Sequence, residues 1–176
     1  KNPIQPLLPS KQLVMLFEKN STRTRVSFEA GINHLGGNAI YLNAVNTQLS
    51  RGESIADTAK VLSGYGDIVM MRCHKHSDLL EFANNASIPV INGLSDFSHP
   101  CQVMADLMTF YELKGDIKGR KVTWLGDGNN MCNSWIIAAQ LFKFELSLAL
   151  SENYPANTEL LNTAIQNGAN IKVTTN

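Results

Sequence analysis

Short apolar runs alternate with segments of helical periodicity along the chain of 176 residues. The apolar run 12–17 predicts a strand, and the apolar residues within 28–35 recur at helical spacing before two glycines end the pattern. The same alternation predicts further strands at 38–42, 67–72, 89–92, 121–126, 146–150 and 171–174, and further helices that begin at Ser54, cover 78–86, 99–114 and 158–166, and include Trp135. Strands that alternate with helices are typical of an α/β fold, in which helices cover both faces of a parallel sheet.

Two of these segments carry enough apolar residues for a more specific prediction. Residues 67–72 are too apolar for an exposed strand, which predicts a central position in the sheet. In the helix predicted over 99–114, apolar side chains form two stripes, and we expect both stripes to be buried. The stripes consist of Val103, Leu107 and Phe110, and of Met104, Met108 and Tyr111.

Residues 115–120 interrupt the pattern with two glycines and three charged side chains. We therefore expect a parallel-sheet α/β/α domain over 1–115, followed by the start of a second, Rossmann-like α/β domain over 116–176. The second part predicts one and a half βαβ units, which are too few to close a core well. Because the chain begins in a proline-rich loop and stops at a strand, we expect both of its ends to have been cut from a longer protein.

The charges of the chain cancel, with 15 basic and 15 acidic residues. No overall field favours a nucleic acid or an acidic membrane, so any anion binding must be local. No apolar run has the length of a membrane span. Cys73, Cys101 and Cys132 form no CxxC pair and no even set, which argues against a disulfide framework or a zinc ribbon and fits a reducing cytosol.

Residues 17–29 place hydroxyls and guanidiniums where the first strand turns into the first helix. The first turn of that helix offers free main-chain N–H groups and the positive end of the helix dipole, both of which attract an oxyanion. Hydroxyl donors come from Ser21, Thr22 and Thr24, and Arg23 can grip phosphate oxygens with its guanidinium fork. The sequence therefore predicts a phosphate site here. The alternative is a Ser or Thr helix cap followed by solvated arginines.

Other polar residues follow the ends of strands, where ligands of parallel sheets bind. Arg72 ends an apolar strand, and a buried guanidinium needs a carboxylate or a ligand anion, so a structural ion pair is the alternative to a binding role. His99 and Gln102 lie three residues apart at a helix start and can face the same ligand, although His99 also fits a helix cap or a core histidine. Together these groups outline a site for a small phosphate-bearing molecule that also presents a carbonyl and an amide.

Two further patterns favour less specific interpretations. Residues 73–76 contain a cysteine and two histidines, but their spacing matches no common zinc motif, and we interpret them as a loop between strand and helix. The run 126–130, with Glu152 after the next strand, imitates a dinucleotide fingerprint but lacks its third glycine. We expect Asn130 to hold a polar group at the start of the following helix instead.

Residues 17–29 together with residues 99–102 resemble the carbamoyltransferase family, and the resemblance runs through essentially the whole chain. Residues 126–130, and residues 52–59 together with Gln48, are similar to the ornithine branch of that family. Gly52 stands where relatives carry a lysine, so the resemblance implies no cationic contact from that position. The family's motifs for its amino-acid substrate and the first helix of its first domain are missing from this sequence, which implies truncation at both ends.

The resemblance implies transfer of the carbamoyl group from carbamoyl phosphate to the δ-amine of L-ornithine, giving L-citrulline and phosphate in arginine biosynthesis. It implies no metal and no cofactor, and a cytoplasmic homotrimer whose active sites are shared between subunits. Arg72, His99 and Thr24 would stabilise the oxyanion that develops at the carbonyl carbon, and Asn130 would contact ornithine. Carbamoyl phosphate would be bound by Ser21, Thr22, Arg23, Thr24, Arg72, His99 and Gln102, with Gln48 reaching the phosphate from a neighbouring subunit.

Two alternatives stand beside this interpretation. Within the same reaction class, aspartate or another amine could be the acceptor. Outside it, the chain would be a non-catalytic phosphate-binding fragment.

Overall fold

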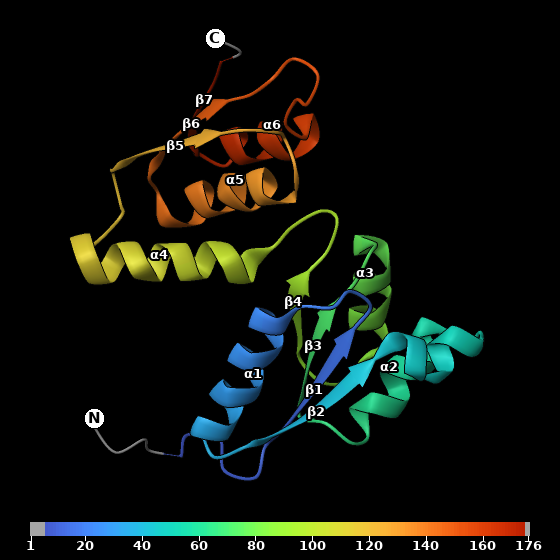
Figure 1. Ribbon diagram of the computed structural model, residues 1–176. Helices are drawn as coiled ribbons and strands as arrows, with labels where there is room; N and C mark the ends of the chain where they lie inside the picture. Colours follow the sequence, from blue (N-terminus) through green and yellow to red (C-terminus); the bar gives the residue numbers. More distant parts are fainter. Residues whose placement is uncertain (1–5, 175–176) are drawn as a thin grey trace. The chain divides into compact units, whose positions relative to one another are not determined.

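The computed structural model describes residues 6–174 and falls into two compact units, Lys1–Ser95 and Asp96–Asn176. The first unit contains a parallel sheet with the strand order β2-β1-β3-β4 (Figure 1). Its elements are β1 (Gln12–Phe17), α1 (Thr22–His34), β2 (Asn38–Asn43), α2 (Ile55–Ser63), β3 (Ile68–Arg72), α3 (His76–Asn85) and β4 (Val90–Leu94). The predicted central position of 67–72 is confirmed, because β3 lies between β1 and β4.

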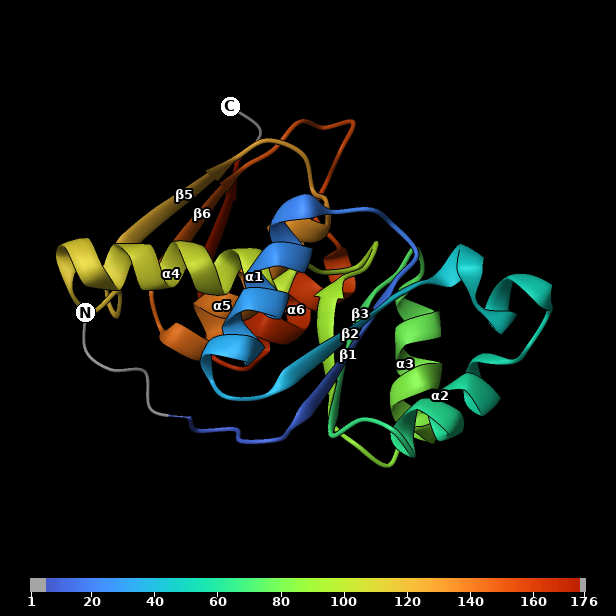
Figure 2. The same ribbon diagram turned by 60° about the horizontal axis from the view of Figure 1, so that its bottom comes forward.

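Helices cover both faces of the first sheet, as the sequence predicts for an α/β/α domain. Side chains alternate along β1, so Met15 and Phe17 pack with Ile32 of α1, whereas Leu16 packs in the cluster that contains Phe82 of α3. Both views show α1 on one face of the sheet and α2 and α3 on the other (Figures 1 and 2). The burial of each face ties the register of β1 to its helices.

Between β2 and α2, the chain forms two short 3-10 helices. They are η1 (Ala44–Asn46) and η2 (Gln48–Arg51). The hydroxyl of Thr47 between them donates to the carbonyl of Ala44 at 2.7 Å. Ser54 then caps α2 by accepting the N–H of Asp57 at 3.0 Å. Local hydrogen bonds therefore give this polar segment a defined shape.

The second unit contains a parallel sheet with the strand order β5-β6-β7. Its elements are α4 (Pro100–Lys114), β5 (Lys121–Leu125), α5 (Asn130–Phe142), β6 (Glu145–Ala149), α6 (Thr158–Gln166) and β7 (Asn170–Thr174). Its core joins Leu146 and Leu148 of β6 to Ile136 of α5 and Ala164 of α6. The parallel α/β class predicted from the sequence is therefore confirmed in both units.

The expectation that helices cover both faces of a sheet fails for this second sheet. Among residues 6–174, helices cover only one of its faces. Thr123, Ser147 and Lys172 stand in register across the three strands on the other face. Thr123 and Lys172 are exposed, and no described helix packs against them. The one and a half βαβ units supply helices for a single face.

The expectation of two buried stripes on α4 is also wrong. Val103 and Leu107 of the first stripe are buried in the core of the second unit, where α4 packs against α5. Met104, Met108 and Tyr111 of the second stripe are 52%, 62% and 68% exposed. Periodicity shows that both stripes are apolar, but burial needs a neighbouring element, and the described residues supply one for a single stripe.

The chain divides into its two compact units between Ser95 and Asp96, and the domain boundary between residues 115 and 116 stays a prediction. Within the second unit, α4 packs against α5. Residues 115–120 form a connection between α4 and β5, as their glycines predict.

Within residues 6–174, no helix combines the length and the apolarity needed to cross a membrane.

Candidate anion site

The first turn of α1 begins where the sequence places the phosphate site. Ser21 is extended (φ −157°, ψ 112°), and its hydroxyl oxygen accepts the N–H of Thr24 at 3.3 Å. The same hydroxyl donates to Oγ1 of Thr24 at 3.0 Å, which leaves the Thr24 hydroxyl proton available to a ligand. Ser21 is therefore a helix cap, and this capping role is compatible with an anion site on the same turn.

Some hydrogen-bond donors of this turn are not used by the described chain. Among residues 6–174, the main-chain N–H groups of Thr22 and Arg23 have no acceptor. Arg23 is exposed and forms no ion pair within that part of the chain. Two N–H groups, the positive end of the helix dipole and the arginine Arg23 thus belong to one helix turn, and all of them favour a bound oxyanion.

Arg72 supplies a second cation at the end of β3. Its Nε atom is buried without a hydrogen-bond partner, and no carboxylate of residues 6–174 pairs with its guanidinium. Burial lowers the pKa of Arg72, because removing a cation from water disfavours the charged form. The structural ion pair that the sequence left open is absent from the described residues, so the buried charge lacks the partner that it needs.

Strand pairing brings the first turn of α1 and Arg72 to the same edge of the first sheet. Arg72 is the cross-strand neighbour of Phe17, the last residue of β1, and the N–H of Glu18 donates to the carbonyl of Arg72 at 2.8 Å. The carboxylate of Glu18 accepts the N–H of His74 at 2.7 Å. Figure 1 shows α1 starting beyond the arrowheads of β1 and β3. This is the edge at which parallel sheets bind ligands.

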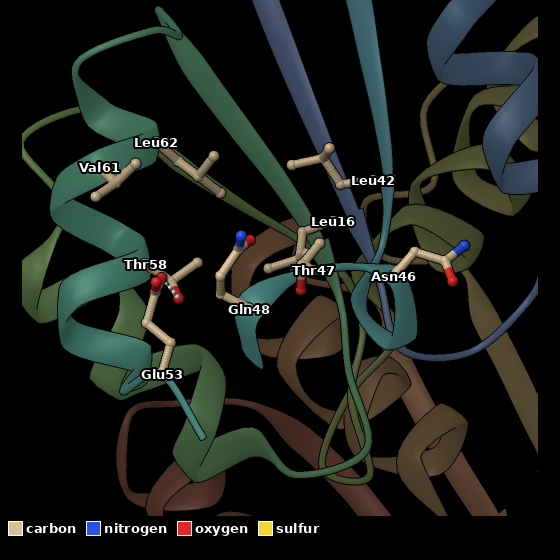
Figure 3. A pocket seen from close by; sticks show the side chains of 9 residues that line it. All are labelled: Leu16, Leu42, Asn46, Thr47, Gln48, Glu53, Thr58, Val61 and Leu62. Atoms are coloured by element: carbon tan, nitrogen blue, oxygen red, sulfur yellow. Dashed lines mark hydrogen bonds between the residues drawn. The ribbon is translucent and has the colours of Figure 1, made fainter. Parts of the chain in front are cut away.

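Gln48, the remaining predicted phosphate ligand of the first unit, lies in η2. Its side chain points into a cavity of about 470 Å³ between the 3-10 segment, α2 and the strands (Figure 3). The hydroxyl of Thr58 donates to Glu53 at 2.7 Å on the same wall. The amide of Gln48 has no hydrogen-bond partner among residues 6–174, so it is available to a group outside the described chain. The cavity is lined by Leu16, Leu42, Asn46, Thr47, Gln48, Glu53, Thr58, Val61 and Leu62.

The other predicted site residues lie in the second unit. His99 precedes α4, and the amide of Gln102 in the first turn donates to Asp106 at 2.9 Å. The main-chain N–H of His99 donates to Oγ of Ser134 at 2.8 Å, and that hydroxyl donates to the carbonyl of Asn130 at 2.7 Å. Ser134 therefore connects two predicted site residues from different helices.

Sequence reasoning missed this role of Ser134 and a similar one of its neighbour. The amide of Asn133 donates to the carbonyl of Phe97 at 2.9 Å, and both Asn133 and Ser134 are buried. The available signal is a pair of polar residues on the buried face of an otherwise apolar helix. Buried polar groups are almost always hydrogen-bonded, which would have directed attention to this pair.

The run 126–130 turns out to be closed to a dinucleotide. The N–H of Gly128 donates to the carbonyl of Tyr154 at 2.8 Å, and a Cβ added at Gly128 would overlap the backbone of Pro155. Asn129 caps α5 by accepting the N–H groups of Met131 and Cys132. Asn130 is therefore the first helical residue and is not the side-chain cap.

Residues 73–75 form the connection between β3 and α3, so the loop interpretation is confirmed. The thiol of Cys73 donates to the carbonyl of Lys75 at 3.1 Å, and Nδ1 of His76 lies 2.9 Å from the hydroxyl oxygen of Ser95. Within residues 6–174, no group of three His, Cys, Asp or Glu side chains is arranged around a common metal position. The Cys73 thiol and the His76 imidazole thus have structural hydrogen-bond partners.

Fold and site define this chain as a parallel α/β protein with a candidate anion site at the carboxyl edge of its first sheet. Comparison with protein families narrows the class. Residues 1–112 match the carbamoyl-P binding domain of aspartate/ornithine carbamoyltransferases, and residues 118–176 match the Asp/Orn binding domain. The chain belongs to the aspartate/ornithine carbamoyltransferase family, which confirms the resemblance drawn from its motifs.

Individual relatives agree with this assignment. The chain is 58% identical over 154 residues to "Ornithine carbamoyltransferase 1, anabolic" of Pseudomonas savastanoi pv. phaseolicola, covering 88% of this chain and 50% of the relative. It is 55% identical over 163 residues to an ornithine carbamoyltransferase of Pyrococcus horikoshii, covering 93% and 51%. The solved Pyrococcus furiosus enzyme superimposes with a TM-score of 0.90 at 49% identity, covering 96% of this chain and 55% of that one. The chain thus spans about half the length of the relatives it matches.

Proposed function

We propose that this chain is part of an ornithine carbamoyltransferase of arginine biosynthesis. Residues 1–115 form the carbamoyl phosphate-binding domain in this proposal, and residues 116–176 form the first part of the ornithine-binding domain. The enzyme transfers the carbamoyl group of carbamoyl phosphate to the δ-amine of L-ornithine. The products are L-citrulline and phosphate.

The observation that carries this proposal is the unpaired charge at the edge of the first sheet. Arg72 is partly buried without a carboxylate, and Arg23 stands beside the free N–H groups of α1. A phosphate dianion would satisfy both cations and the main-chain donors together. Ser21, Thr22 and Thr24 provide hydroxyls on the same turn. His99 and Gln102 are the residues proposed to bind the carbamoyl end, and Gln48 is proposed to reach the phosphate of a neighbouring subunit.

The chemistry needs charge stabilisation more than acid–base groups. The lone pair of the δ-nitrogen attacks the carbamoyl carbon and forms the C–N bond. The C–O bond to phosphate then breaks, phosphate leaves with the electron pair, and the proton that the nitrogen loses passes to the departing phosphate. Arg72, His99 and Thr24 stabilise the oxyanion in this scheme, while the α1 donors take up the charge that leaves with phosphate. Positioning of the two reactants contributes much of the remaining rate enhancement.

Ornithine is the proposed acceptor because all three relatives described above are named ornithine carbamoyltransferase. Asn130 is proposed to contact it. The main chain of Asn130 is tied to that of His99 through the hydroxyl of Ser134. One buried hydroxyl thereby supports a residue proposed for each substrate.

A product assay tests the proposal, and it uses the full-length protein because the relatives are about twice as long as this chain. Carbamoyl phosphate is supplied with ornithine, aspartate or putrescine, and citrulline is expected only with ornithine. Arg72→Met should lower kcat/KM by about 100-fold or more, because an oxyanion donor is lost. Arg120→Met, in the exposed loop before β5, is the matched control and should leave the rate unchanged.

The outcomes separate the alternatives. Product from aspartate or putrescine alone would show that the acceptor is wrong. A folded protein that binds phosphate and carbamoylates none of the three amines would be a non-catalytic phosphate-binding protein. Full activity of Arg72→Met would remove the proposed role of that residue.

We also propose a cytoplasmic homotrimer in which Gln48 acts in trans. Full-length Arg72→Ala and Gln48→Ala chains should each be weak alone. In mixed trimers a Gln48→Ala chain keeps its own Arg72 and receives Gln48 from the neighbour, which rebuilds a complete site. Activity above the average of the two parents, in hybrids verified by mass, supports sharing. Activity equal to that average would show that Gln48 acts within its own subunit or has no role.

A further inference from the structure

The two arginines of the motif Ser21–Arg25 occupy different environments. Arg23 has no partner among residues 6–174, whereas Nε of Arg25 pairs with Oε2 of Glu29 at 3.3 Å. The guanidinium carbon of Arg25 also lies 3.8 Å from the centre of the Tyr41 ring, in the geometry of a cation–π contact. Residues two positions apart on a helix point to different sides. One bound phosphate therefore cannot engage both guanidiniums equally.

The face of α1 that carries Arg25 is the face that packs on the sheet. Phe28 and Ile32 follow Arg25 at helical spacing and pack with the strands. Arg25 thus ends the contact stripe of α1 at its first turn, directly over β2. Its side chain is 45% exposed, and its guanidinium contacts both the Glu29 carboxylate and the Tyr41 ring.

Tyr41 connects this contact to the edge of the sheet. Its ring lies 5.2 Å from that of Phe17, centre to centre and tilted by 50°. Phe17 is the last residue of β1, is 1% exposed, and pairs across the strands with Arg72. A continuous set of contacts therefore runs from the first turn of α1 through Tyr41 and Phe17 to the strand ends that carry the anion site.

We propose that Arg25 is a positioning residue, which holds the first turn of α1 on Tyr41 and so sets the direction of Arg23 and the free N–H groups. The proposal rests on the proposed function, since it assigns roles within the phosphate site. A planar guanidinium can stack on the ring while its edge pairs with Glu29, whereas a lysine ammonium cannot do both in the same way. Arg25 itself does not contact the phosphate.

A double-mutant cycle on inorganic phosphate binding tests this division, with calorimetry as the measurement. Arg25→Gln and Tyr41→Leu should each weaken binding about 2- to 5-fold, the range expected for a half-exposed cation–π contact. The double variant should bind as either single variant does, because both changes remove the same contact. Tyr41→Phe is the matched control: it keeps the ring, and the Tyr41 hydroxyl has no hydrogen bond within residues 6–174. It should bind like the unchanged protein.

Two results would overturn the proposal. If Arg25→Gln weakens binding as strongly in the Tyr41→Leu background as in the unchanged protein, Arg25 contacts the phosphate directly. If Tyr41→Phe loses as much affinity as Tyr41→Leu, the ring contact is not what positions the turn.

A second measurement without ligand keeps this inference separate from the proposed function. Amide hydrogen exchange of residues 24–27 should be faster in Arg25→Gln and Tyr41→Leu than in the unchanged protein and in Tyr41→Phe. If the unchanged protein fails to bind phosphate, the proposed function fails, and the exchange rates still decide whether Arg25 holds the turn. Equal exchange in all four proteins would show that it does not.

Discussion

The helices α1 and α5 both begin directly beyond a parallel strand, and both are capped by a polar side chain, but only the first start is open. Ser21 accepts one N–H, that of Thr24, and leaves two donors of α1 without an acceptor among residues 6–174. The side chain of Asn129 accepts two N–H groups of α5, whereas the carbonyl oxygens of Ser21 and Asn129 each accept one further N–H in the same way. The same local motif therefore supplies donors for a ligand in one unit and satisfies its own chain in the other.

The surroundings of the two helix N-termini also differ, because only those of α5 are filled by other parts of the chain. The space beside the loop before α5 is filled, because the backbone of Pro155 lies next to Gly128. The carbonyl of Tyr154 accepts the N–H of Gly128. At the edge beyond β1 and β3, a partly buried cation lies without a counter-charge. A helix start is thus an anion site only where its donors and its surroundings both stay unsatisfied.

The pKa of the Cys132 thiol describes the electrostatic environment of the first turn of α5. A thiol in the first turn of a helix usually has a lowered pKa, because the helix dipole favours the thiolate. Burial instead raises the pKa of Cys132 to about 11. Desolvation is the cause of this shift, and it keeps the Cys132 thiol in its neutral form.

The largest expected effect comes from filling the space beside the α5 start. Gly128→Ala would bring a Cβ onto the carbonyl oxygen of Pro155 and should destabilise the protein by about 3 kcal/mol or more. Urea unfolding measures the loss. The control is Gly31→Ala within α1, where no atom lies within 4 Å of the added Cβ; it should raise stability by about 0.5–1 kcal/mol. Equal stability of Gly128→Ala and the unchanged protein would show that this turn has room for a ligand.

A smaller effect concerns the thiol at the α5 start. In a variant with Cys73 and Cys101 replaced by serine, thiolate absorbance at 240 nm should rise with a midpoint near pH 11, because burial holds Cys132 neutral. Added phosphate should leave that midpoint unchanged. A midpoint below pH 9 would mean that α5 stabilises an anion after all, and the contrast between the two helix starts would be lost.

The smallest effect comes from removing the two caps. Ser21→Ala and Asn129→Ala should each lower the free energy of unfolding by about 1 kcal/mol, because each deletes the acceptor of first-turn N–H groups. Phosphate binding should distinguish them: Ser21→Ala is expected to lose about 10-fold in affinity through the lost hydroxyl. Asn129→Ala should bind phosphate as the unchanged protein does. Similar losses of affinity in both variants would contradict the comparison.

Periodicity and capping chemistry determined most of the local structure. The strand over 12–17 and the helix over 158–166 agree with β1 and α6, because strands and helices differ in the spacing of their apolar residues. Ser21 and Ser54 cap the helices that follow them, as short polar side chains before a helical pattern predict. The residue types of the anion site were readable for the same reason, since strand, turn and helix start are contiguous in the chain.

Tertiary structure alone decided which of these groups are satisfied. From the sequence, Arg23 is the predicted phosphate ligand and Arg25 has no assigned partner, and only the structure places Arg25 over the ring of Tyr41. From the sequence, the partner of Arg72 is either a carboxylate or a ligand anion. Only the tertiary structure shows that no carboxylate of the described residues pairs with it. The second apolar stripe of α4 is exposed because no described element covers it. Periodicity is a property of one segment, whereas burial and pairing depend on segments far apart in the chain, and folding alone brings those together.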